Sequence, residues 1–347
     1  MTSGRSRRFH AALSTVVAAA FVWWFFHDVN ITAAIREIRQ ARVSYLAAAV
    51  AMSLAGFGHR IGRWRYLVAP FKWVPIRSLA TAVFMGWTVS AILPGRVGEI
   101  ARAVVLGRRE GLRSSALLGT IVLERLLDAL ALVLLLALSL TAGRAVALKS
   151  SQASLMLSIR TGALITTGAL AGIAAALVIA HRLRDRIKPA LRSVADRLPA
   201  GVGRRGWSSL ESFGSGISGA LKDLPPGETP VHLRTWVAVH TIILWLMICG
   251  VHFLLLQAFR IDASVFRIPP LLFLITLGLS VPVPAGVGSY HKAVQLGLTG
   301  MLGVSNETAT GYALVSHAVT LGPPAVIGAW LLASEGLSLP AVTRMDS

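Results

Sequence analysis

Cysteine and the common catalytic motifs are scarce in this sequence. A single cysteine among 347 residues excludes a disulfide framework and a cysteine-based metal site. The nine histidines are scattered without an HExxH or HxH spacing, so we predict no metal site. DxD and HxxxxD motifs and a nucleotide-binding loop are also missing. The sequence therefore favours neither a metal nor an organic cofactor, and gives little support for a transferase.

Acidic residues are also few. Fifteen Asp and Glu against 34 Lys and Arg give a formal net charge of +19, while 54% of the residues are hydrophobic and only 14% are charged. The basic residues lie between apolar runs, so membrane topology and anionic lipid headgroups explain them better than nucleic acid does. This composition is typical of a polytopic membrane protein.

The apolar runs predict an all-α polytopic membrane protein with about six full spans and two re-entrant helical hairpins. The segment 28–44 has isoleucines at helical spacing with arginines between them, which favours an interfacial helix. Arg63 and Trp64 are expected to anchor the chain at the membrane interface. The predicted full spans are 11–26, 45–57, 115–140, 163–180, 236–259 and 304–332.

Two apolar segments are too short to cross. The segment 78–93 ends at Pro94 and Gly95, whereas roughly 20 residues are needed to span a bilayer as a helix. Proline lacks the N–H that continues a helix, so the chain should break there and return as a basic arm. The segment 269–283 meets a similar break. The predicted break residues are Pro94, Gly95, Gly98, Pro282, Pro284, Gly286 and Gly288.

The two short segments also resemble each other. When Pro94 is placed on Pro284, seven of the 14 positions in 94–107 match those in 284–297. We predict an internal duplication within a single integral membrane domain, 1–347. Its first repeat unit is about 45–141, its polar cytoplasmic connection is 181–234, and its second repeat unit is about 235–334.

The distribution of basic residues predicts the topology. With both termini in the cytoplasm, the strongly basic stretches 59–77, 94–113 and 181–234 lie inside, and the less basic stretches 28–44 and 142–160 lie outside, as the positive-inside rule requires. The two hairpins then open to opposite sides of the membrane. We therefore expect an inverted repeat, an architecture that many secondary transporters use.

Charged residues beside such apolar segments suggest a functional site, because a charge at bilayer depth is costly unless it is paired or wetted. The arginines could bind a lipid phosphate, and the carboxylates could orient them or take up a proton. The alternative is mutual neutralisation that locks the hairpin against the next span, or, for His317, a satisfied core histidine. The candidate lipid-headgroup residues are Arg96, Glu99, Arg102, Glu124, Arg125, Asp128, His291, Lys292 and His317.

Three ordered motifs resemble the flippase-like membrane family that also forms the transmembrane region of lysylphosphatidylglycerol synthase. They cover Pro-x-Arg-x-Gly-Glu-x-x-Arg, Glu-Arg-x-x-Asp and Pro-x-Gly-x-Gly. The residues that carry the resemblance are Pro94, Arg96, Gly98, Glu99 and Arg102, then Glu124, Arg125 and Asp128, then Pro284, Gly286 and Gly288.

The resemblance implies a bacterial inner-membrane protein that handles lipids or lipid-linked molecules, with flipping as the leading function. Two departures limit what it implies. The soluble aminoacyl-transferring domain of the synthase is not seen, so we expect no enzyme activity of that kind. The family's late motif often has an acidic residue after the glycines, whereas Ser289, Tyr290 and His291 stand here.

Three functions are compatible with the sequence. The first is a flippase or transporter for an anionic phospholipid or a polyprenyl-phosphate-linked molecule. The second is a membrane-embedded lipid-modifying transferase, suggested by the carboxylates, and the third is a non-catalytic partner subunit of a separate lipid synthase. The expected partners are membrane lipids and not nucleic acid, and both a homo-oligomer and a synthase partner are left open.

Overall fold

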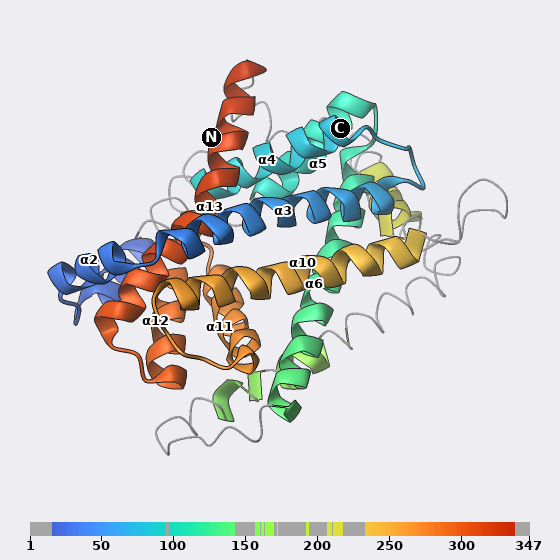
Figure 1. Ribbon diagram of the computed structural model, residues 1–347. Helices are drawn as coiled ribbons and strands as arrows, with labels where there is room; N and C mark the ends of the chain where they lie inside the picture. Colours follow the sequence, from blue (N-terminus) through green and yellow to red (C-terminus); the bar gives the residue numbers. More distant parts are fainter. Residues whose placement is uncertain are drawn as a thin grey trace.

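The computed structural model is helical throughout the part of the chain that it describes, and that part contains no strand. Two long helices run side by side, and shorter helices pack beside and behind them (Figure 1). The described residues are 16–94, 97–142, 157–159, 161–162, 164–169, 172, 192–193, 207–209, 211–217 and 233–336. The predicted span 163–180 and the connection 181–234 lie largely outside them.

Helices α3 (Val43–Val68) and α10 (Leu233–Ala258) form the most extensive helix pair. They run antiparallel, and the backbone N–H of Arg42 donates to the carbonyl of Ala258 at 2.9 Å where α3 begins and α10 ends. Helix α3 is longer than the predicted span 45–57, because it continues through much of the predicted basic connection 59–77. This extension carries charged side chains into the interior of the protein.

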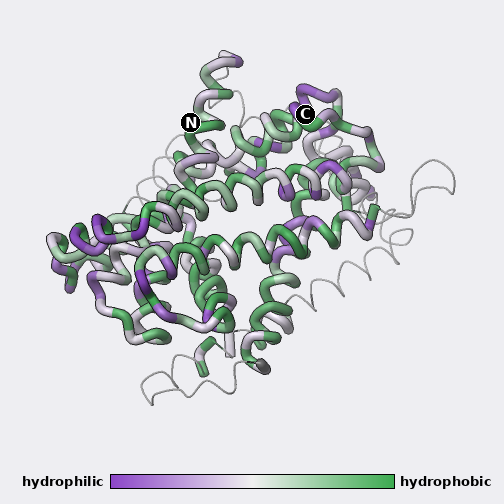
Figure 2. Tube along the Cα trace, in the orientation of Figure 1, coloured by the Kyte–Doolittle hydropathy of each residue, from purple (hydrophilic) through white to green (hydrophobic). Residues whose placement is uncertain are grey.

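At least two helices have the length and composition of membrane spans, so the chain is an integral membrane protein. These are α10 and α13 (Asn306–Ser334). The helix Val16–Phe26 is followed by α2 (Ile31–Gln40) at a bend of 80°, and this pair passes the same test only if it is taken as one span. Figure 2 shows α10 hydrophobic along most of its length and α2 with marked hydrophilic stretches. The larger number of six full spans stays a prediction.

The first predicted hairpin is present as α4 (Ile76–Ile92) and α5 (Val97–Glu110), which pack on each other. Gly95 and Arg96, at the break, lie outside the described residues. The two helices cross closely, because a Cβ atom on Gly98 would lie 1.9 Å from the carbonyl oxygen of Gly86. Glycine at this crossing therefore permits the backbone contact that holds the hairpin together.

The second predicted hairpin consists of α11 (Ile268–Ser280) and α12 (Ser289–Leu302), preceded by η2 (Val265–Arg267). The break between them contains η3 (Pro284–Gly286). Backbone φ angles are positive at Ala285, Gly286 and Gly288, at 54°, 70° and 80°. Left-handed backbone suits glycine, so the two glycines allow the tight reversal that the sequence predicted.

The two hairpins begin at opposite ends of α6 (Ser114–Ala142). At one end, Lys72, shortly before α4, forms an ion pair with Glu110, the last residue of α5, and α6 begins soon afterwards at Ser114. At the other end, the Ser139 hydroxyl of α6 donates to the carbonyl of Phe266, immediately before α11. A helix–break–helix unit therefore enters the molecule from each end, and α6 runs between them.

Candidate functional site

The predicted charged residues of α5 and α6 meet in one cluster. Arg102 Nη2 lies 3.0 Å from Glu99 Oε2 and 2.5 Å from Glu124 Oε2. Arg125 Nη2 lies 3.0 Å from Asp128 Oδ2, and Arg125 Nε lies 3.6 Å from Glu99 Oε1. The spacings of three and four residues seen in the sequence place these groups on facing helix surfaces, and the packing of α5 on α6 completes the network.

A further arginine from α3 joins this cluster and was assigned wrongly from the sequence. Arg63 lies 2.8 Å from Glu124 Oε1 and 2.6 Å from Asp128 Oδ1, and the side chains of Arg63 and Glu124 are both 0% exposed. Arg63 is therefore an interior ion-pair partner and not an interfacial anchor. The sequence held one signal for this role: Arg60 and Arg63 are three residues apart, so they share a helix face if the helix extends through this stretch.

Trp64 is likewise buried within the protein and is therefore not the exposed interfacial anchor that the sequence predicted. Its indole N–H donates to the Thr120 hydroxyl at 3.0 Å, and the guanidinium of Arg102 lies 4.9 Å from its ring centroid. An indole N–H is usually hydrogen-bonded when the ring is buried. The bond to Thr120 therefore fixes the ring of Trp64, and the ring packs against the charge cluster at Arg102.

Arg60 is a fourth arginine at the site that the sequence analysis did not select. Its guanidinium lies 5.3 Å from the Trp87 ring centroid and 5.8 Å from the Phe57 ring centroid, within cation–π range. Arg63, Arg102 and Arg125 balance the three carboxylates, but Arg60 has no ion pair with any described residue. Within the described part of the chain, the site thus carries one positive charge in excess.

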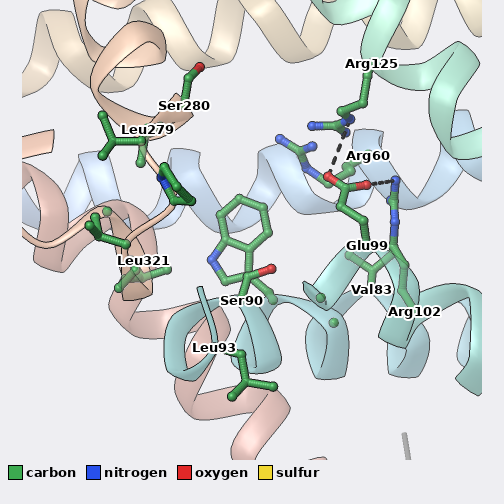
Figure 3. A pocket seen from close by; sticks show the side chains of 18 residues that line it. Arg60, Val83, Ser90, Leu93, Glu99, Arg102, Arg125, Leu279, Ser280 and Leu321 are labelled. Atoms are coloured by element: carbon green, nitrogen blue, oxygen red, sulfur yellow. Dashed lines mark hydrogen bonds and ion pairs between the residues drawn. The ribbon is translucent and has the colours of Figure 1, made fainter. Parts of the chain in front are cut away.

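A cavity of about 450 Å³ lies beside this cluster. Its walls come from both hairpins: α4 and α5 on one side, and the end of α11 with the second break on the other (Figure 3). Trp87, Leu279, Pro282 and Leu321 contribute apolar surface. The polar wall consists of Arg60, Ser90, Glu99, Arg102, Arg125 and Ser280. The cavity thus has a charged part and an apolar part, as an amphiphilic ligand requires.

The predicted break residues occupy several positions around this cavity. Gly98, Pro282 and Gly286 line it. Pro284 lies within η3, and Gly288 approaches the backbone of the helix Val16–Phe26 so closely that a Cβ atom would meet Val22 N at 2.7 Å. Pro94 precedes the undescribed residues of the first break.

Two of the predicted residues of the second unit, His291 and His317, form a pair apart from the charge cluster. The rings of His291 and His317 are 4.6 Å apart, and His317 Nε2 lies 2.9 Å from the carbonyl oxygen of Ala285, which lines the cavity. Lys292 does not join them, since its ammonium donates to the Trp24 carbonyl at 3.2 Å and to Gln295 Oε1 at 2.7 Å. A headgroup role for these three residues stays a prediction.

The described residues contain no group of three or more His, Cys, Asp or Glu side chains that could hold a metal ion. Every carboxylate of the cluster contacts arginine. The available chemistry is therefore electrostatic: closely paired charges in a medium of low polarity, with an arginine-rich wall facing the cavity.

Comparison with known proteins identifies the family. No curated protein and no solved structure matches the chain. A family model for the lysylphosphatidylglycerol synthase TM region matches residues 11–328. This match covers most of the 347 residues and includes both hairpins, the charge cluster and the cavity walls. The chain therefore belongs to the family of the lysylphosphatidylglycerol synthase transmembrane region.

Proposed function

We propose that this protein is a flippase that moves an anionic phospholipid or a lipid-linked molecule of polyprenyl-phosphate type across the bacterial inner membrane. Its family membership indicates a function related to membrane lipids. The observation that carries the finer proposal is the cavity between the two hairpin breaks, with its charged and apolar walls. Such a cavity can accept a polar headgroup and the first part of an apolar chain together.

The arrangement of the hairpins supports translocation over simple binding. The hairpins begin at opposite ends of α6, and both contribute walls to the same cavity. If they are inverted repeats, small movements of each hairpin would open the cavity alternately to the two leaflets. We therefore propose that the predicted duplication is functional.

The carboxylates of the cluster support binding over catalysis. Glu124 contacts Arg63 and Arg102, and Asp128 contacts Arg63 and Arg125. A carboxylate held by two guanidinium groups is strongly stabilised in its ionised form, which makes it a poor proton donor for group transfer. We propose that this network positions the arginine-rich wall.

Vesicles containing the purified protein test the proposed function. Fluorescent phosphatidylglycerol in both leaflets should become fully accessible to an impermeant quencher such as dithionite, whereas protein-free vesicles should keep the inner-leaflet half protected. Mass spectrometry of the same lipids should show no new covalent product. Protected inner-leaflet lipid would contradict the flippase, and a modified lipid would favour the transferase.

Cysteine labelling tests the proposed topology. Cys249 is the single cysteine, so Cys249→Ala gives a background without thiols. Arg77 and Asp262 are both exposed. In the predicted topology, the stretch 59–77 lies in the cytoplasm, and the stretch 260–268, with only two basic residues, lies outside. An impermeant maleimide should label Asp262→Cys in intact cells and Arg77→Cys only after permeabilisation. The reverse pattern would place both termini outside the cytoplasm.

A further inference from the structure

The side-chain donors without acceptors are concentrated at the cavity. Six buried side-chain nitrogen or oxygen atoms in the described part of the chain have no hydrogen-bond partner, and all six are donors. Arg63 Nε and Arg267 Nη1 belong to residues that do not line the cavity. The other four belong to residues that line it: Arg60 Nε, Trp87 Nε1, Arg102 Nε and Arg125 Nε. Of these, Arg125 Nε still faces a carboxylate oxygen, Glu99 Oε1, at 3.6 Å, which is beyond hydrogen-bond distance.

This concentration of donors indicates the chemistry of a ligand that would fit the cavity. Burying a donor without an acceptor is unfavourable, so a ligand that supplies several acceptors would be stabilised there. Hydroxyl and amide groups mix donors with acceptors, whereas phosphate oxygens are acceptors. The cavity therefore suits a phosphate group better than a sugar or an amide.

The charge balance indicates where the phosphate binds. The three carboxylates are matched by Arg63, Arg102 and Arg125, so these guanidiniums are largely neutralised. Arg60 lines the same cavity without a carboxylate partner among the described residues, and Trp87 lies against its guanidinium at 5.3 Å. A ligand with one negative charge would compensate Arg60 without disturbing the network.

We infer that the cavity binds the phosphate group of a lipid through Arg60 and the indole N–H of Trp87. The inference rests on the proposed lipid-transport function and assigns its substrate class. It also separates two roles among the arginines. Arg60 recognises the phosphate, and Arg63 and Arg102 hold the fold of the charged wall.

Binding to the purified full chain in a neutral detergent tests this assignment. Five probes separate the sources of the phosphate: dihexanoylphosphatidylglycerol, dihexanoylphosphatidylcholine, farnesyl phosphate, inorganic phosphate and the phosphate-free dihexanoylglycerol. We expect a phosphate-containing lipid to bind at least tenfold more tightly than dihexanoylglycerol. A preference for phosphatidylglycerol would assign a phospholipid, and one for farnesyl phosphate would assign a polyprenyl carrier. Tighter binding of inorganic phosphate than of any lipid would overturn the inference.

Two variants and a matched control identify the residues. Arg60→Gln should weaken binding of the preferred lipid about tenfold or more, and Trp87→Phe, which keeps the ring and removes the N–H, should weaken it severalfold. Arg39→Gln removes the same charge from an exposed position in α2 and should leave affinity unchanged. Equal affinity in Arg60→Gln and Arg39→Gln would overturn the assignment.

Arg60→Lys and Trp87→Phe provide a second test of the binding site. If Arg60→Gln does not fold, Arg60→Lys, which keeps the charge but loses the planar donor fork, should weaken binding measurably, and Trp87→Phe should do the same. Unchanged affinity in both variants would contradict the inference. Selective phosphate binding together with protected lipid in the vesicle assay would show that the site exists while the flippase function fails.

Discussion

Replacing Glu124 with glutamine is expected to lower the free energy of unfolding by about 3 to 5 kcal/mol. Glu124 is fully buried and accepts from Arg63 at 2.8 Å and from Arg102 at 2.5 Å. Neutralising it leaves two buried guanidiniums facing each other across a neutral amide. A buried ion pair adds little when intact, but removing one partner leaves uncompensated charge in a medium of low polarity.

The measurement is unfolding in a detergent–denaturant titration, with Glu335→Gln as the control. Glu335 pairs with Arg109, and both side chains are about one-third exposed, so its loss should cost about 0 to 1 kcal/mol. The comparison holds the chemical change constant and varies only burial. Similar unfolding midpoints for the two variants would contradict the assignment of Glu124 to the interior.

The second large effect is expected at the crossing of α4 and α5. In Gly98→Ala, the new methyl group would lie 1.9 Å from the carbonyl oxygen of Gly86 and 2.1 Å from the hydroxyl of Ser90. The hairpin would have to separate, which should cost about 3 kcal/mol or more. Because Gly98 and Ser90 line the cavity, lipid translocation should fall together with stability.

Gly58→Ala is the matched control for this substitution. Gly58 lies within α3, and a Cβ atom added there meets nothing within 4 Å. Alanine favours a helix over glycine by up to about 1 kcal/mol, so this variant should be as stable as the wild type or slightly more stable. A stable, active Gly98→Ala protein would show that the hairpin is not tightly packed at this crossing.

The hairpins could be predicted from the sequence because their cause is local. Proline removes a hydrogen bond when it stands beyond the first turn of a helix, and the predicted arms 78–93 and 269–283 agree closely with α4 (Ile76–Ile92) and α11 (Ile268–Ser280). The charge motif on α5 and α6 was also visible, because residues three or four apart share a helix face. These features depend on neighbouring residues alone.

The contribution of α3 could not be predicted in the same way. Arg63 and Glu124 are separated by 61 positions, and the local pattern of arginines beside Trp64 is typical of a membrane interface. Only the packing of α3 against α6 shows that Arg63 is paired in the interior and that Arg60 faces the cavity. The contact of Lys292 could not be predicted for the same reason. Lys292 lies next to His291 in the sequence, but its ammonium donates to a carbonyl of the helix Val16–Phe26.

The central claim, that lipid moves through the cavity between the hairpins, is tested most directly by filling it. Ser280 lines the cavity, and its hydroxyl donates to the carbonyl of Thr276 in its own helix. Ser334, at the exposed end of α13, donates similarly to the carbonyl of Leu331. The two positions therefore offer the same substitution, Ser→Trp, at a residue that lines the cavity and at one that does not.

The measurement is the rate at which fluorescent phosphatidylglycerol crosses reconstituted vesicles. We expect Ser280→Trp to reduce this rate at least tenfold, and Ser334→Trp to match the wild type, with equal unfolding midpoints for both variants. Equal translocation rates in the two variants would show that the lipid does not pass through this cavity.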